Sequence, residues 1–172
     1  MGYYLSCHRI PQERLEAVCT NQEEYYRYDD EFEELPQLEE YPHYHRSEHI
    51  GWICLGKISF SSRIQGLLDP AWRDPSTWAP SMPPTTAAGA AVSGWHEADV
   101  IGSTYKLRYN TADEVAEISK ALDALDLEAL VREHLVRHMR ERDSDFVERL
   151  EHLRDFYRIA AERGQAVLTD QE

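Results

Sequence analysis

The sequence lacks the cysteine patterns that cross-link small secreted domains and the long apolar segments that cross membranes. Its 172 residues include only three cysteines, Cys7, Cys19 and Cys54, and none belongs to a CxxC pair. A disulfide framework and a cysteine-ligated zinc site are therefore not predicted. No run approaches the roughly 20 apolar residues that cross a bilayer, and MGYYLSCHRI lacks the basic and apolar regions of a secretion signal. These absences predict a cytoplasmic protein with reduced thiols and no membrane association.

Signatures of catalysis and of nucleotide binding are also missing. Ser59, Ser61 and Ser62 do not lie in a GxSxG turn, and no cysteine lies in a nucleophile signature. The chain has no GxGxxG or GxxxxGK[ST] loop that would hold a phosphate. No catalytic residue and no cofactor is predicted, and the sequence leans towards a non-enzymatic role.

Negative charge is what the chain has in excess. The formal net charge is −14, and residues 12–40 alone hold eleven acids against two arginines. A surface of this sign repels phosphate backbones and anionic lipids, which argues against a nucleic-acid or membrane partner. It attracts a basic protein and speeds its association at low salt. An acidic surface that only keeps the protein soluble is the alternative interpretation.

The acidic run is predicted to form one face of a helix. Asn21 can cap this helix and Pro36 ends it, while apolar side chains recur every three or four positions at Tyr25, Tyr28, Phe32 and Leu35. The opposite side carries the acids. We expect four of them to bind a basic protein partner: Asp29, Asp30, Glu33 and Glu34.

Local patterns predict an α+β fold. GYYLSCHRI and STYKLRYN alternate like strands, a short helix is expected over about 11–19, and QAVLT reads as a final strand. Thr111 and Glu114 form a capping box, Asp126 and Ser144 can open two more helices, and Gly164 can end the last one. We expect a small mixed sheet covered by amphipathic helices, in a single domain over residues 1–172.

The middle of the chain is harder to interpret. SEHIGWICLG favours a helix over a strand, and KISFSSRIQGLL fits either. Residues of about 69–99 are predicted to form a long irregular Pro/Trp/Ala-rich insertion, because five prolines precede TTAAGAAVSG. Trp72, Trp78 and Trp95 would pin this loop to the core or present it to a partner.

Two groups of histidines are candidate metal ligands. His134 and His138 are one helical turn apart, but HLVRH lacks the glutamate of HExxH. His43, His45 and His49 lie beside several glutamates in EEYPHYHRSEHI. Histidines bonded to backbone or carboxylate groups are the commoner explanation in both places, so no metal site is predicted.

Three segments of the sequence resemble a known family. The MGYY strand with its short helix, the block LRYNTADEVAEISKALDALDLEAL and the ending LRDFYRIAAERGQAVL occur in the order seen in the YfbM-like bacterial domains of unknown function. The resemblance implies a compact α+β domain and supplies no catalytic residue. Residues 20–96 depart from the family pattern, and MRERDSDF replaces the family's Tyr-Pro after the penultimate helix.

Together these observations favour a non-catalytic acidic binding protein. Its role would be that of an immunity or inhibitor protein that neutralises a basic partner, by analogy with toxin-neutralising members of bacterial families of this kind. The rival hypothesis is a metal-dependent hydrolase or a small-molecule binder that uses one of the histidine groups. The sequence does not predict an oligomeric state.

Overall fold

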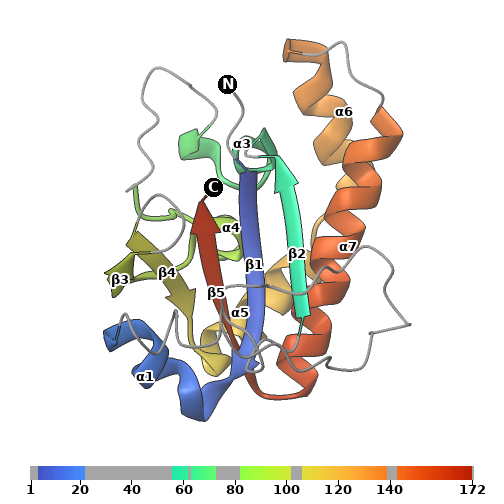
Figure 1. Ribbon diagram of the computed structural model, residues 1–172. Coiled ribbons are helices and arrows are strands. Elements are labelled where there is room, and N and C mark those ends of the chain that lie inside the picture. The colour runs from blue at the N-terminus through green and yellow to red at the C-terminus, as the bar shows by residue number, and fades with distance from the viewer. Residues whose placement is uncertain are drawn as a thin grey trace.

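The described residues form one five-stranded sheet with helices packed on it (Figure 1). A computed structural model describes residues 4–21, 56–61, 63–72, 82–101, 106–138 and 143–171. The strands are β1 (Tyr4–Pro11), β2 (Gly56–Ser61), β3 (His96–Ile101), β4 (Lys106–Asn110) and β5 (Gln165–Gln171). The helices are η1 (Gln12–Arg14), α1 (Leu15–Thr20), α3 (Arg63–Leu68), η3 (Pro70–Trp72), α4 (Ala87–Ser93), α5 (Ala112–Asp123), α6 (Leu127–His138) and α7 (Asp143–Glu162).

The sheet places the first and last strands of the chain next to each other. Its order is β2-β1-β5-β4-β3, and each pairing between the described strands is antiparallel. The expected α+β class is confirmed, although the pairings are more uniform than the expected mixed sheet. Because β5 pairs with β1 on one side and with β4 on the other, the C-terminal strand lies at the centre of the sheet (Figure 1).

One face of the sheet carries the larger hydrophobic core. Leu5 and Cys7 of β1 and Val167 of β5 contact apolar side chains of α3, α4, α5, α6 and α7. The predicted stripe of α7 is confirmed, since all five of its members are buried: Phe146, Leu150, Leu153, Tyr157 and Ala160. Their spacing of three and four residues places them on one side of the helix.

The opposite face of the sheet carries a smaller core. Leu15, Val18 and Cys19 of α1 pack against apolar residues of β1, β3, β4 and β5. Strand residues alternate between the two faces, so β1 contributes Leu5 to the larger core and Ile10 to the smaller one. The short N-terminal helix therefore covers the β3–β4 end of this face, as the contact between α1 and β3 shows.

Predicted helix boundaries are confirmed at Thr111, Asp126 and Gly164, whereas Ser144, which was expected to open the last helix, lies inside α7. Thr111 and Glu114 form both halves of the capping box, and Asp126 Oδ1 accepts a hydrogen bond from the Ala129 amide at 3.0 Å. Gly164 has φ of 60° and ends the last helix in the left-handed region. These signals are local in sequence, which is why they could be read without the tertiary structure.

The expected irregular insertion over 69–99 is wrong in its second half. TTAAGAAVSG forms α4, a helix capped by Thr86, whose Oγ1 accepts a hydrogen bond from the Gly89 amide at 2.9 Å. HEADVI, which no pattern singled out, forms β3. Alanine is the best helix former, and small side chains let α4 pack fully buried between its neighbours. Trp72 is buried in η3, while Trp78 lies outside the described residues.

Of the remaining predicted segments, one is described by the structure and two lie largely outside the described residues. KISFSSRIQGLL, which fitted a strand or a helix, contains both, β2 followed by α3. The acidic helix expected over 21–36 and most of SEHIGWICLG lie outside the described residues.

Gly89 permits the close approach of α4 to Asp69. Asp69 is fully buried and accepts hydrogen bonds from the amides of Thr85 at 2.7 Å and Ala71 at 3.1 Å. A Cβ added at Gly89 would overlap the Asp69 carboxylate and lie 2.8 Å from its Cβ. These contacts hold the start of α4 against η3. Neither α4 nor Asp69 can therefore move easily to make room for a side chain at position 89.

We therefore expect Gly89→Ala to lower the free energy of unfolding by about 3 kcal/mol, the upper range for overpacking a core. Gly164→Ala is the matched control, because nothing lies within 4 Å of its added Cβ and only the positive φ is unfavourable. That control should cost about 1 kcal/mol. Urea denaturation of both variants measures the difference, and equal costs would contradict this account of Gly89.

Candidate functional site

Two buried polar side chains of β4 close the end of α4. The C-terminal carbonyls of a helix lack intrahelical partners and must be satisfied when they are buried. Arg108 of β4 donates from Nε to Ser93 O at 2.6 Å and from Nη2 to Gly94 O at 3.2 Å. Asn110 donates to Ala90 O at 2.9 Å. Strand β4 thus caps the helix that precedes it in sequence.

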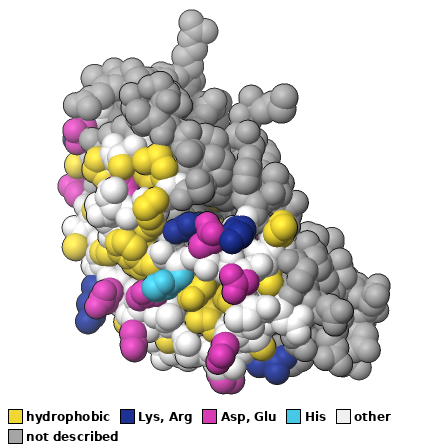
Figure 2. Space-filling model, turned by 90° about the vertical axis from the view of Figure 1, so that its left-hand side faces the viewer, with side chains coloured by type: hydrophobic (Ala, Val, Ile, Leu, Met, Phe, Trp, Pro, Cys, Tyr) yellow, Lys and Arg dark blue, Asp and Glu magenta, His cyan; other side chains and the backbone are white. Residues whose placement is uncertain are grey.

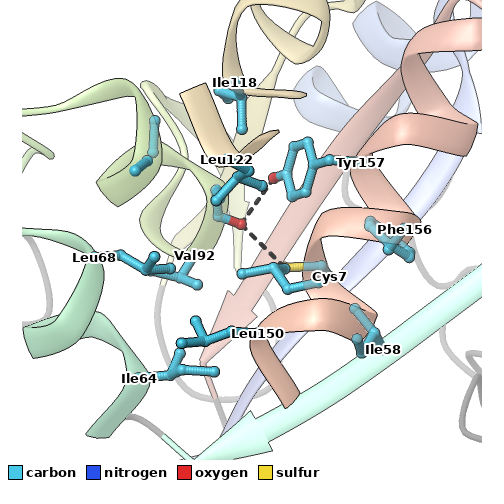
Figure 3. Close-up of a cluster of buried hydrophobic side chains, with 14 of the residues drawn as sticks. Cys7, Ile58, Ile64, Leu68, Val92, Ile118, Leu122, Leu150, Phe156 and Tyr157 are labelled. Atoms are coloured by element: carbon cyan, nitrogen blue, oxygen red, sulfur yellow. Dashed lines mark hydrogen bonds between the residues drawn. The ribbon is translucent and has the colours of Figure 1, made fainter. Parts of the chain in front are cut away.

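Tyr157 and Cys7 complete this cap from two other elements (Figure 3). The Tyr157 hydroxyl donates to Ala91 O at 2.8 Å, and the Cys7 thiol donates to the same oxygen at 3.3 Å. Asn110 Nδ2 also donates to the Tyr157 hydroxyl at 3.2 Å. Helix α7 and strand β1 are thereby tied to one carbonyl group of α4.

These buried groups are poorly suited to nucleophilic chemistry. Burial raises the pKa of the Cys7 thiol and, with a smaller contribution from nearby Cys7, the pKa of Tyr157. Burial, together with Asp99, raises the pKa of Cys19 to about 12. A thiol must lose its proton to react, so Cys7 and Cys19, both free thiols, are neutral near pH 7. The polar interior of the larger core is structural.

We expect Tyr157→Phe to lower the free energy of unfolding by about 1–2 kcal/mol, because it removes a buried hydrogen bond without opening a large cavity. Arg158→Gln is a neighbouring control on the same helix. Its guanidinium makes only exposed ion pairs, to Asp123 at 3.0 Å and Asp155 at 2.8 Å, which contribute little. Chemical denaturation compares the two. If Tyr157→Phe is as stable as the parent, the hydrogen bond from the Tyr157 hydroxyl to Ala91 O does not stabilise the fold.

A second set of buried polar residues lies on the opposite face of β1 and β5. Ser6 stands directly opposite Asp170, and His8 follows Ser6 by two residues on the same side of β1. All three are buried to 1% exposure or less. Serine, histidine and aspartate are the residue types of a hydrolase, but here they are closed off from solvent. This grouping could not be predicted from the sequence, because residue 170 reaches residue 6 only through the pairing of β5 with β1.

One accessible feature of the described residues is a set of carboxylates, which we call the acidic face. It comprises Glu13 and Glu16 of η1–α1, Glu97 and Asp99 of β3, and Asp113, Glu114 and Glu117 of α5. Figure 2 looks at the side of the molecule on which β3 and α1 lie. It shows Asp and Glu side chains spread across the described part of this side, with a histidine among them.

Direct contacts join the elements of the acidic face. Gln12 Oε1 accepts a hydrogen bond from the Ala112 amide at 2.7 Å, which ties η1 to the start of α5. His96 of β3 lies 2.6 Å from Glu114 through its Nε2 atom, and its ring stacks on Tyr109 with 5.0 Å between centroids. Helix α1 packs on β3. These contacts make η1–α1, β3 and the start of α5 neighbours, although Glu97 and Asp99 project from the side of β3 opposite to the one on which α1 packs.

Few cations offset these carboxylates. Glu97 contacts Lys106 at 3.1 Å and Arg108 at 3.7 Å, and Glu114 contacts His96. Within the described residues, the other five members of the acidic face take part in no ion pair. Unneutralised charge on an exposed surface attracts a partner of opposite charge.

Glu114 connects the acidic face to the stability of α5. Burial alone would raise the pKa of Glu114. It is outweighed by hydrogen bonds from the Thr111 amide at 2.8 Å, from His96 and from the Thr111 hydroxyl, which together lower that pKa below its usual 4.5. A carboxylate whose pKa is lower in the folded state stabilises the fold above its unfolded pKa, and loses that contribution as the pH falls through its folded pKa.

We expect part of the acid sensitivity of the protein to come from this carboxylate. Between pH 5 and pH 3, roughly spanning the ordinary glutamate pKa, Glu114→Gln should lose less stability than the parent. Near neutral pH the variant should be less stable by a few tenths of a kcal/mol to about 1 kcal/mol, since the site is partly exposed. Thermal unfolding across this pH range measures both effects, with Glu117→Gln as the control on the same helix. Parallel pH profiles for all three proteins would rule out the assignment.

The predicted site residues lie largely outside the described part of the chain. This holds for Asp29, Asp30, Glu33 and Glu34, and for the histidines at positions 43, 45 and 49. His134 and His138 belong to α6, but their side chains are not among those described. Among the described residues, no group of three or more His, Cys, Asp or Glu side chains could hold a metal ion.

The structure brings together acids that the sequence did not single out. Glu97 and Asp99 lie on a strand that was not predicted, and Glu13 and Glu16 precede the expected acidic helix. One signal was present in the sequence, since Asp113 and Glu114 occupy the first turn of a well-capped helix, where acids are exposed and favourable. No described helix is both long enough and apolar enough to cross a membrane.

Comparison with known proteins places the fold. Residues 1–169 match the family described as "Domain of unknown function (DUF1877)". The chain is also similar to the crystal structure of YfbM from Escherichia coli, a protein of unknown function, with 14% sequence identity, a TM-score of 0.57 and 98% of each chain covered. At this identity the likeness shows the fold alone. No curated protein matches the chain.

Proposed function

The chain belongs to the DUF1877 family of domains of unknown function, the YfbM-like domain that the sequence motifs suggested, and from this premise we propose that it acts by binding a basic protein. The observation that carries the proposal is the acidic face, whose seven carboxylates lie on the neighbouring elements η1–α1, β3 and α5 and five of which have no ion pair among the described residues.

The clustering of the carboxylates supports binding of a cationic partner, because solubility alone would not require clustered charge. Charges scattered singly over a protein keep it soluble. Carboxylates gathered on contiguous elements instead focus a negative potential, which raises the rate of encounter with a cationic partner and loses strength as salt is added. The concentration of charge on adjoining elements supports binding.

The interior supports a non-catalytic role. In the larger core, the described groups that could act as nucleophiles or acids are used to close α4, and burial keeps Cys7 and Tyr157 protonated. Ser6, His8 and Asp170 are closed off from solvent. A protein whose accessible chemistry is a carboxylate surface is suited to docking.

Two members of the acidic face belong to the acidic run of the sequence. Glu13 and Glu16 belong to the same stretch, residues 12–40, that contains Asp29, Asp30, Glu33 and Glu34. We include these four in the proposed binding surface. The role that best fits such a surface is that of an immunity or inhibitor protein, which neutralises a basic partner by covering it.

We expect the protein, immobilised and exposed to an extract of its host, to retain a basic protein at about 0.05 M salt and to release most of it at about 0.5 M, where screening acts within a few ångströms. Glu13→Gln, Glu16→Gln and Glu117→Gln combined should reduce capture at low salt about tenfold, because three unpaired carboxylates are lost. Quantitative mass spectrometry of the retained proteins measures the change.

A matched control removes the same charge elsewhere. Glu128→Gln, Glu151→Gln and Glu162→Gln combined neutralise three exposed acids on α6 and α7, and this variant should retain the partner nearly as well as the parent. Equal loss in both variants would mean that only net charge matters. Capture of no basic protein, or capture that is insensitive to salt, would refute the proposal.

A further inference from the structure

Strand β5 completes the sheet from its centre (Figure 1). It pairs with β1 along its whole length and with β4 over its middle residues. Val167 belongs to the larger core, while Ala166 and Leu168 belong to the smaller one, and all three are fully buried. Removal of β5 would therefore leave a gap between β1 and β4 that a strand with this side-chain pattern fits.

A connection of two residues joins β5 to the end of α7. Arg163 and Gly164 lie between Glu162, the last residue of α7, and Gln165, the first residue of β5, and both are exposed. Gly164 has φ of 60°, a conformation that is disfavoured roughly tenfold for other L-residues. Nothing lies within 4 Å of a Cβ added at this position. A substitution there therefore acts on the backbone conformation of the turn and not on packing.

We propose that the turn formed by Arg163 and Gly164 is a hinge through which β5 can be exchanged between two copies of this chain, and that the glycine keeps the protein monomeric. In the closed form, β5 turns back onto its own sheet. In the open form, the hinge is extended and β5 fills the gap between β1 and β4 of the second copy. The exchange is reciprocal, so it gives a closed, symmetric dimer.

The contacts of β5 are the same in both forms, so the conformation of the hinge decides between them. A short connection presents β5 to its own sheet at an effective concentration in the millimolar range, which favours the closed form in dilute solution. A residue that resists positive φ strains this short hinge and disfavours each closed turn about tenfold, and strained short hinges favour exchange. Because the dimer releases two closed turns, its association constant should rise by about a hundredfold. The net charge of −14 opposes association equally in every uncharged variant of the hinge.

Substitutions of Gly164 test the hinge without touching the core. Gly164→Val should form a dimer when the full-length protein is refolded from urea at about 0.1 mM, whereas the parent should stay monomeric. Gly164→Asn is the matched control, because asparagine tolerates the left-handed conformation, and it should behave like the parent. Size-exclusion chromatography with light scattering measures the masses. The dimer should have the circular dichroism of the parent, since its secondary structure is unchanged.

A cross-link shows which copy supplies β5. Cys7 of β1 stands directly opposite Thr169 of β5, and opposed Cα atoms of antiparallel strands lie about 4.5–5.5 Å apart, within reach of a disulfide. Thr169→Cys is combined with the hinge variants, and refolding is carried out with oxidised glutathione as the oxidant. On a non-reducing denaturing gel, we expect a covalent dimer with Gly164→Val and a monomer with an internal disulfide with Gly164→Asn. Cys7→Ser, added to each variant, should remove both products.

Each contrary result overturns the proposal. A Gly164→Val protein that is folded and monomeric shows that the hinge does not control exchange. Equal amounts of dimer from Gly164→Val and Gly164→Asn show that the backbone conformation at this position is irrelevant. A dimer in which the disulfide is internal to each chain has formed side by side, without exchange of β5. If Gly164→Val does not regain the circular dichroism of the parent, Gly164→Ala replaces it, with the same expectation at a smaller fraction of dimer.

Discussion

The arrangement of the molecule depends on how the buried end of α4 is closed. Its last carbonyls accept hydrogen bonds from Arg108 and Asn110 of β4, Tyr157 of α7 and Cys7 of β1. A helix end without such partners would leave unsatisfied oxygens in the core, at a cost of about 1–3 kcal/mol for each group. The network therefore fixes the positions of the sheet and of α7 relative to one short helix. It also engages four of the described buried polar groups on this side of the sheet, those of Arg108, Asn110, Tyr157 and Cys7.

The acidic face is a consequence of this scaffold. Pairing of β5 with β1 holds the two ends of the chain at the centre of the sheet, and β4 and β3 extend it to one side. The chain leaves β1 through η1, where Gln12 accepts a hydrogen bond from the first amide of α5. Helix α1 then packs on β3. Three separate acidic segments thus become neighbours, and their charges act together because each is anchored to a rigid element.

Local rules in the sequence were reliable where a side chain acts within its own turn. The capping box at Thr111, the cap at Asp126 and the positive φ at Gly164 follow from chemistry within a few residues, as does the apolar stripe of α7. The same rules failed at residues 87–101. The prolines upstream predicted an irregular segment, yet Thr86 caps a helix whose alanines allow close packing against α3 and α5. The preference of alanine for a helix is intrinsic, whereas the packing that buries α4 exists only when those neighbours are present.

By itself, the sequence determined the α+β class, the starts of α5 and α6, the end of α7 and the sign of the net charge, because periodicity, caps and net charge are properties of short segments or of composition. Only the tertiary structure decided which strands adjoin, and therefore which residues meet. Ser6 lies opposite Asp170, and His96 contacts Glu114, because strand register and packing join positions that no sequence spacing relates. A surface made from three segments is a long-range property, and the hydrogen bonds that assemble it are formed across the fold.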